Sequence, residues 1–177
     1  LDDKILTSWN GLMLGALARA GMILEEPRAL AAARKNLAFI RARLWDAESK
    51  TLHHRWRDGE RDSVQLLDDY AFLLEGVLNL YEATLEANDL EFAIAVADGM
   101  LERFEDKDNG GFWQAAADDP HLILRMKEDH DGAEPSGNAM AAIALQRLSI
   151  LRGNKEYGEK ALQVLRLNQS NMNSAPR

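Results

Sequence analysis

Ionisable side chains are concentrated in residues 125–138, a stretch that runs through a Gly/Pro turn into an almost wholly apolar segment. Such a turn places polar groups at the mouth of a hydrophobic structure, where binding and catalytic side chains are commonly held. Asp131 and Glu134 lie in this stretch, and a second acidic pair, Asp68 and Asp69, precedes another apolar segment. Because carboxyl groups can act as general acid and general base, Asp69, Asp131 and Glu134 are the candidate catalytic residues.

Hydrolysis of a glycosidic bond with inversion fits this chemistry, since it uses two carboxyl groups about 6.5–9.5 Å apart. Two cations, Arg125 and Lys127, lie two residues apart on a predicted strand and therefore face one side. There they can bind an anionic group or neutralise the carboxylates of Asp131 and Glu134. Aromatic and amide side chains can also contact a sugar. Together with the two cations, the candidate substrate-binding residues are Trp9, Asn10, Tyr70, Trp113, Arg125, Lys127 and Asn138.

Each of these residues also has a structural interpretation. Asp68 or Asp69 can cap the helix that follows, a role that contributes about 1 kcal/mol, and Ser136 can cap a later helix. If Asp68 is the cap, Asp69 lies in the first turn with its side chain free to project outwards. The two cations can equally belong to an ion-pair network, and Trp9 can belong to the core.

The sequence predicts no cofactor and no metal site. His53 and His54 are adjacent in a predicted strand, so their side chains point to opposite faces and do not share a metal. Residues 106–117 resemble a calcium loop, but the fifth position is Gly110 and the twelfth is Ala117, where a bidentate glutamate is required. The chain has no cysteine, which excludes a thiolate metal site and a disulfide.

The candidate residues stand near the starts of apolar helices, which alternate with amphipathic ones. Helices predicted at 8–24, 68–81 and 136–151 are apolar on nearly every face, as expected of buried inner helices. Helices predicted at 27–44, 90–104 and 155–167 have one apolar stripe and one charged face, as expected of outer helices. This alternation is typical of helical hairpins stacked side by side.

We therefore predict an all-α fold in which residues 1–167 form three stacked helical hairpins, part of an α/α toroid. A polar tail at 168–177 should fray. Polar residues cluster at the N-terminal ends of the inner helices, which favours a toroid with a funnel at that end over an open solenoid. Short β-hairpins are expected in the connections, one at 52–61 with Asp58-Gly59 as its turn and one at 110–125.

Composition limits the partners. The formal net charge is −8 and the pI is near 5.0, with no run of lysine or arginine that could track phosphates, so neither nucleic acid nor an anionic membrane is expected to bind. No apolar run approaches the ~20 residues of a membrane span, and the first residues do not resemble a signal peptide. With the lack of cysteine, this predicts a cytoplasmic protein. Because position 1 is leucine, we expect the sequence to begin inside a longer gene product.

Three motifs, at residues 2–13, 67–73 and 131–138, resemble the family of large proteins related to spermatogenesis-associated protein 20. The resemblance extends from the first residue to about Leu167. It implies a thioredoxin-like domain followed by a six-hairpin α/α toroid similar to those of N-acylglucosamine 2-epimerases and inverting glycosidases. Three of the six hairpins are visible here, and His130 is the one histidine near the expected end that could serve as an epimerase catalytic histidine.

Two functions follow as hypotheses. The first is a carbohydrate-active domain of glycosidase or epimerase type with a sugar ligand, which should gather carboxyls, cations and aromatics in one pocket. The second is a non-catalytic scaffold that binds a thioredoxin-like domain or another protein, which should scatter them into caps and ion pairs. The inner helices have more apolar surface than three outer helices can cover, so we expect a partner: the remainder of a longer parent protein or a second copy of the chain.

Overall fold

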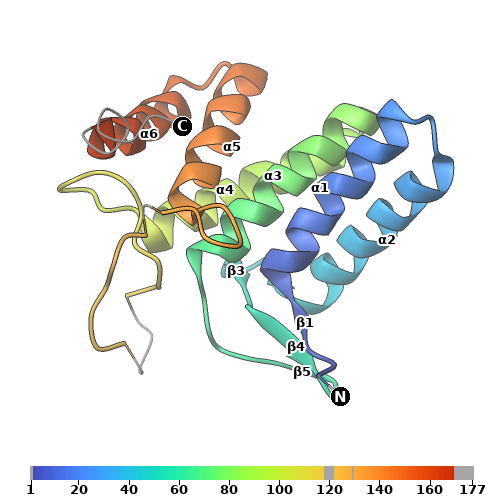
Figure 1. Ribbon diagram of the computed structural model, residues 1–177, viewed down its shortest axis with the longest axis horizontal. Coiled ribbons are helices and arrows are strands. Elements are labelled where there is room, and N and C mark those ends of the chain that lie inside the picture. The colour runs from blue at the N-terminus through green and yellow to red at the C-terminus, as the bar shows by residue number, and fades with distance from the viewer. Residues whose placement is uncertain (1, 118–121, 129, 170–177) are drawn as a thin grey trace.

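Helices arranged as three consecutive hairpins make up most of the molecule (Figure 1). The computed structural model describes residues 2–117, 122–128 and 130–169. Within these ranges the helices are α1 (Thr7–Ile23), α2 (Pro27–Arg43), α3 (Leu67–Thr84), α4 (Ala87–Phe104), α5 (Gly137–Arg152) and α6 (Lys155–Leu167). Each predicted helix is present, with its ends within three residues of the predicted ones.

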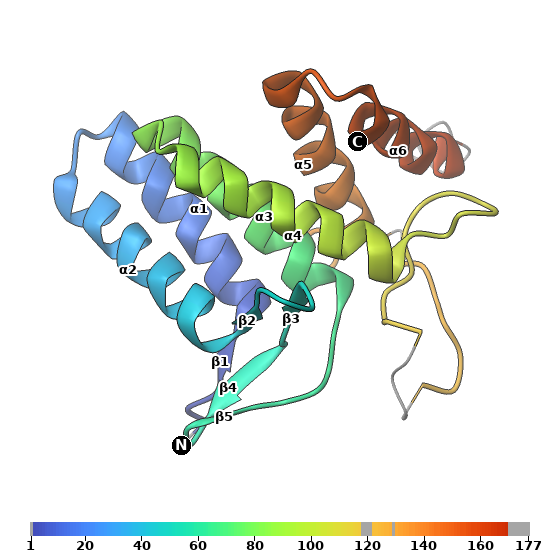
Figure 2. The ribbon, with the colours of Figure 1, turned by 180° about the vertical axis from the view of Figure 1, so that it is seen from behind.

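The helices form an inner and an outer row. α3 packs against both α1 and α5, while α2, α4 and α6 each pack against the inner helix that precedes them. Seen from behind, α4 lies over α3 on the outer side (Figure 2). The predicted fold class, stacked helical hairpins of the α/α toroid type, is confirmed.

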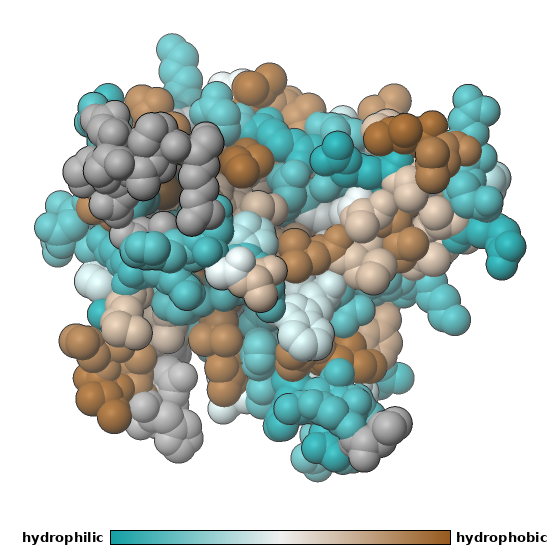
Figure 3. Space-filling model, viewed as in Figure 1, coloured by the Kyte–Doolittle hydropathy of each residue, from teal (hydrophilic) through white to brown (hydrophobic). Residues whose placement is uncertain are grey.

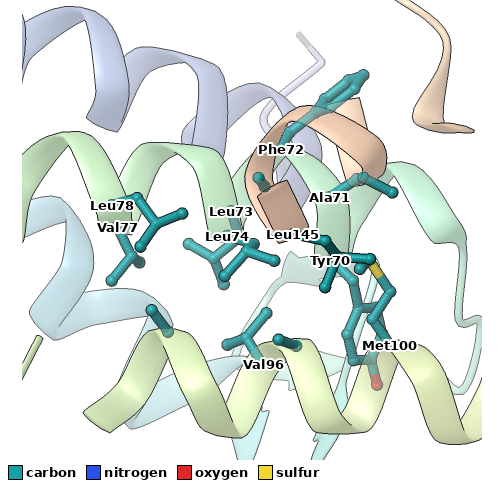
Figure 4. Close-up of a cluster of buried hydrophobic side chains, with 14 of the residues drawn as sticks. Tyr70, Ala71, Phe72, Leu73, Leu74, Val77, Leu78, Val96, Met100 and Leu145 are labelled. Atoms are coloured by element: carbon teal, nitrogen blue, oxygen red, sulfur yellow. The ribbon is translucent and has the colours of Figure 1, made fainter. Parts of the chain in front are cut away.

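α3 is the centre of the core. Twelve of its 18 residues are buried, because neighbours on three sides cover its aliphatic and aromatic side chains (Figure 4). Burial of one such large side chain contributes about 1.5–3 kcal/mol. On the α1 side the two backbones approach closely at Gly11 and Gly76: a Cβ atom added to Gly11 would lie 2.6 Å from the Leu73 nitrogen. A larger residue at either glycine would force the two inner helices apart.

The free N–H groups in the first turn of α1 donate to acceptors outside the helix. Its N-cap residue makes no side-chain bond, so the predicted cap by Thr7 or Ser8 is wrong. Instead the Thr7 N–H donates to the His54 carbonyl (2.9 Å), and the Ser8 N–H donates to Asp69 Oδ1 (2.9 Å). A connecting segment and the neighbouring inner helix thus supply acceptors to the free N–H groups of α1.

α3 begins in the same way. Its N-cap position has no side-chain bond, and the Leu67 N–H donates to the carbonyl of Gln114 (3.0 Å). The prediction that Asp68 or Asp69 caps α3 is therefore wrong. α5 differs, because the Ser136 hydroxyl caps it as predicted. The two aspartates are free for contacts outside their own helix.

Short strands lie in the first connection. β4 (Arg55–Arg57) and β5 (Glu60–Arg61) form the predicted hairpin, with Asp58 and Gly59 at φ values of 52° and 88° in its turn. β1 (Ile5–Leu6) adds to β4 as a third antiparallel strand, and β2 (Trp45–Asp46) pairs with β3 (Thr51–Leu52). This sheet ties the start of α1 to the first connection.

The second predicted hairpin, between 110–113 and 122–125, is wrong. Phe112 forms an isolated bridge with Glu105 instead, and residues 122–125 have no strand structure. The Gln114 N–H does donate to the Met126 carbonyl (2.8 Å), so the two segments touch without forming a ladder. The connection at 118–121 lies outside the described residues, as does the predicted tail from residue 170 onwards.

Apolar side chains remain exposed on the inner helices. Trp9 and Met13 on α1 are 60% and 55% exposed, and Ile143 and Ile150 on α5 are 50% and 73% exposed. A band of apolar residues follows α1 on the face seen in Figure 3. No helix among the described residues is long and apolar enough to cross a membrane.

Candidate functional site

A cavity of about 280 Å³ opens where the N-terminal ends of α3 and α5 meet. Asp68, the second residue of α3, lines one side, and the segment that leads into α5 lines the other. Three carboxyl groups and one imidazole therefore share one small space. The lining residues are Asp68, Glu128, His130, Gly132, Ala133, Glu134, Pro135 and Ser136.

Asp68 is the acid of this cavity whose pKa is raised. Gln114 Nε2 donates to its Oδ2 (2.7 Å), while its Oδ1 is buried and accepts no bond from a described group. Burial is the main cause that raises the pKa of Asp68 to about 6; the Gln114 bond lowers it, and the charges of Glu128 and Glu134 add to the increase. A carboxyl group in this state can hold a proton near neutral pH and release it.

Gly137 makes room for this carboxyl group. A Cβ atom on Gly137 would collide with Asp68 Oδ1, so the first residue of α5 has to lack a side chain for Asp68 to occupy its place. The N-terminal end of α5 consequently lies against the acid. Neither Gln114 nor Gly137 was identified from the sequence, because Gln114 belongs to no motif or charge pattern and Gly137, although it lies in the 131–138 motif, has no side chain that could bind or react.

Glu134 links the cavity to α1. Trp9 Nε1 donates to its Oε1 (2.7 Å), across 125 residues of sequence. The Trp9 ring is exposed and lies outside the core, so the structural interpretation of Trp9 as a core residue is wrong. Asp131 is exposed and accepts the Ser136 N–H (3.0 Å), which holds the turn before α5.

Asp69 is not among the residues that line the cavity, and its side chain is fully buried. Its Oδ1 accepts the Ser8 N–H, and His54 Nδ1 lies 3.1 and 2.9 Å from its two oxygens. The prediction that this side chain projects into a funnel is wrong, because α1 and the first connection enclose it. Burial raises the pKa of Asp69, while its bonds from His54 and Ser8 oppose the increase; the same contact raises the pKa of His54.

Tyr70 is also fully buried. Its hydroxyl accepts the Leu52 N–H (2.7 Å) and donates to the Lys50 carbonyl (3.2 Å), and burial raises its pKa to about 12. Asn10 bonds to the Leu6 carbonyl and to Asn36 of α2. Both predicted substrate-binding residues therefore have structural partners.

Arg125 and Lys127 do face one side, since both cations lie over the ring of Trp113, at 5.2 and 4.7 Å from its centre. Lys127 Nζ donates to Asp106 Oδ2 (2.7 Å) and lowers the pKa of that carboxyl group. The described bonds of Arg125 lead to backbone carbonyl groups at positions 103 and 115. These contacts do not support the predicted neutralisation of the two candidate acids of the 131–134 turn.

Asn138 is 2% exposed and binds backbone. Its Oδ1 accepts the Phe112 N–H (2.8 Å), and its Nδ2 donates to the Phe112 carbonyl (2.9 Å). The side chain therefore joins α5 to the second connection and does not face the cavity. Among the described residues, no group of three or more His, Asp or Glu side chains is arranged to hold a metal ion.

A larger cavity of about 580 Å³ lies between α2 and α4 on the outer side. In its lining, Arg34 lies 3.5 Å from Glu86, and the Arg41 guanidinium lies over the ring of Phe92. It holds none of the candidate residues. We therefore take the smaller, acidic cavity as the candidate site.

Sequence comparison shows that the chain is similar to part of longer proteins. It is 35% identical over 185 residues to spermatogenesis-associated protein 20 of Rattus norvegicus, and 34% identical to the Homo sapiens protein of that name. The alignments cover 99% of this chain but 23% and 24% of those proteins, so the chain spans about a quarter of their length. No family model matches the sequence.

Three solved structures with the same fold have names that describe sugar-acting proteins. A cellobiose 2-epimerase from Spirochaeta thermophila matches 94% of this chain with a TM-score of 0.76, at 18% identity and over 43% of its own length. A family 76 α-mannanase from Bacteroides thetaiotaomicron matches 95% with a TM-score of 0.76, at 17% identity and over 45% of its length. An α-1,6-mannanase of Salegentibacter matches 93% with a TM-score of 0.75, at 12% identity and over 47% of its length. That structure is of an inactive variant in which two consecutive aspartates are replaced by alanine.

Proposed function

We propose that this chain, which is homologous to spermatogenesis-associated protein 20 and has the fold of six-hairpin α/α toroids, carries part of a carbohydrate-acting site. The observation that carries the proposal is the Asp68 carboxyl group, held at a pKa of about 6 in a cavity that it shares with Glu134 and His130. Enzymes that cleave glycosides need two carboxyl groups in different surroundings, one protonated and one ionised. Asp68 and Glu134 are the proposed pair, with Asp68 as the acid.

In the proposed reaction Asp68 is the general acid. It gives its proton to the glycosidic oxygen as the bond from that oxygen to the sugar breaks, while Glu134 accepts a proton from the water that attacks the anomeric carbon. The Trp9 Nε1–H bond fixes the orientation of Glu134, and the exposed Trp9 ring offers a face for the sugar. If the reaction is an epimerisation instead, His130 in the same cavity is the candidate base.

The proposed general acid is Asp68, whereas the sequence alone favoured its neighbour Asp69. The inactive Salegentibacter variant lacks two consecutive aspartates, and this chain has two at the start of α3, of which Asp68 borders the cavity and Asp69 is enclosed. We assign Asp69 to positioning, because it holds the start of α1 and thereby Trp9. Asp131 is assigned to the turn that carries Glu134.

Three further helical hairpins are expected to close the ring. The chain covers 43–47% of the toroids that it resembles, and the exposed apolar side chains of α1 and α5 need a partner. The remainder of a longer parent protein is the first candidate, and a second copy of this chain is the other. Sedimentation of the purified chain distinguishes them, since a stable dimer of defined mass indicates the second copy.

The test is sugar binding and turnover by an intact protein that contains this chain with three further hairpins. The panel is cellobiose, mannose and α-1,6-linked mannose oligomers, which proteins of this fold act on or bind. Asp68→Asn and Glu134→Gln should each abolish turnover, while Asp58→Asn in the exposed β4–β5 turn should not change it. Turnover that persists in both variants would refute the assignment.

The scaffold function stays as the alternative, on one specific observation. Asp69, Tyr70, Lys127 and Asn138 all have structural partners and do not line the cavity. Absence of any sugar-dependent signal across the panel, together with capture of a thioredoxin-like domain, would favour the scaffold.

A cytoplasmic location belongs to the same proposal, supported by the absence of cysteine from the chain. Fractionation of cells that produce the intact protein, followed by detection in the soluble cytoplasmic fraction or in another fraction, tests it.

A further inference from the structure

The described lining of the candidate cavity carries three carboxyl groups and one imidazole. These belong to Asp68, Glu128, Glu134 and His130, and the described lining holds no arginine or lysine. The nearest cation along the chain, Lys127, is engaged with Asp106 and with the Gly110 carbonyl (2.6 Å). A ligand in this cavity therefore meets carboxylates without an adjacent ammonium or guanidinium group to accept its own negative charge.

The cavity also has more hydrogen-bond acceptors than donors. Its three carboxyl groups offer acceptors, of which Asp68 Oδ1 is buried against Gly137 and accepts no bond from a described group. The amide group that Gln114 could donate is already bound to Asp68 Oδ2, and the Ser136 N–H is bound to Asp131. Because ionised carboxylates accept hydrogen bonds and cannot donate them, a ligand that fits here has to bring donors.

We infer that the cavity selects sugars by charge, taking a sugar with a protonated amino group in preference to its neutral counterpart and excluding sugar phosphates and sugar carboxylates. This inference rests on the proposed function, since it specifies the ligand of the same site. A protonated amino group adds a positive charge and three N–H donors, which match the carboxylates that line the cavity. A phosphate adds negative charge and acceptors alone, which repel the same wall.

The experiment compares glucosamine, glucose and glucose 6-phosphate by titration calorimetry on the intact protein. The titrations are run at low salt and at about pH 6.5, where the amino group is protonated. Glucosamine should bind at least about tenfold more tightly than glucose, and glucose 6-phosphate should show no measurable binding. Raising the salt concentration should reduce the preference for glucosamine, because it screens the exposed part of the interaction.

Two matched variants locate the effect. Glu128→Gln removes one charge of the cavity wall and should reduce the ratio of glucosamine to glucose affinity several-fold. Glu91→Gln removes one charge from the exposed face of α4 and should leave the ratio unchanged. Equal responses of the two variants would show that net charge, and not the cavity, sets the preference.

The outcomes separate this inference from the function on which it rests. Binding of neutral sugars with no preference for glucosamine, or tighter binding of glucose 6-phosphate, would overturn the charge selection and leave the carbohydrate function standing. No binding of any of the three sugars, combined with no turnover across the neutral panel, would overturn both.

Discussion

Replacement of Asp69 by alanine should destabilise the protein far more than the same change at Asp68. The substitution leaves the Ser8 N–H and His54 Nδ1 without their acceptor inside a fully buried site. Loss of a helix-capping acceptor costs about 1 kcal/mol, and loss of a bond to an ionised group costs about 1.5–3 kcal/mol. We therefore expect a decrease of about 3 kcal/mol in the free energy of unfolding, which lowers the Tm by roughly 6–12 °C for a chain of this size.

The assay is urea unfolding followed by circular dichroism, with His54→Ala and the double variant alongside. Because His54 and Asp69 share one bond, the double variant should be more stable than the sum of the single effects predicts, by about 1–2 kcal/mol. Asp68→Ala serves as the matched control on the adjacent residue. If Asp69→Ala costs less than about 1 kcal/mol, or no more than Asp68→Ala, the capping of α1 by α3 is not what the contacts indicate.

Three further predictions concern the cavity and its support. The pKa of Asp68 is about 6 in the folded state against 3.8 for the free group, so between these pH values the native state binds more protons and the free energy of unfolding falls as pH rises. Asp68→Asn should flatten this dependence of the unfolding free energy on pH, measured by urea titrations from about pH 4 to 7. An unchanged pH dependence would contradict the raised pKa. Gly137→Ala places a Cβ atom against Asp68 Oδ1 and should cost about 1–3 kcal/mol, part of which Asp68→Ala should restore in a double variant. Asn138→Ala leaves the Phe112 N–H and carbonyl unpaired and should cost about 2–3 kcal/mol in thermal melts, whereas Gln146→Ala on the exposed face of α5 should stay within about 0.5 kcal/mol.

The helices and their order could be predicted because hydrophobic periodicity is a local property of the sequence. The inner helices are apolar on every face, and this alone indicates that other elements surround them. The caps of α1 and α3 could not be predicted, because their acceptors come from residues 54, 69 and 114 and no local signal connects those positions. The hairpin predicted in the second connection was wrong for the same reason, since Phe112 pairs with Glu105 at the end of α4 and not with residues 122–125.

The sequence predicted that the site lies at the N-terminal ends of the inner helices, but it did not predict which acidic side chain of α3 lines the cavity. Successive residues of an α-helix point about 100° apart, so Asp68 and Asp69 face different surroundings although they are chemically identical neighbours. Which of them borders the cavity depends on the rotation of α3 about its axis, and that is set by packing against α1 and α5. The pairing of Trp9 with Glu134 follows from the same packing, because it brings the start of α1 to the segment before α5.

The capping of inner helices by their neighbours has a consequence for how the protein folds. In helical repeat arrays each unit contacts only its neighbours, and stability is approximately the sum of the terms for single units and for neighbouring pairs, so units can unfold one at a time. Here the first turn of α1 depends on α3 and the first turn of α3 depends on the connection that leads to α5. Loss of the second hairpin would thus leave unpaired N–H groups in the first, and loss of the second connection would leave the Leu67 N–H of α3 unpaired, so the first two hairpins should unfold together and not stepwise.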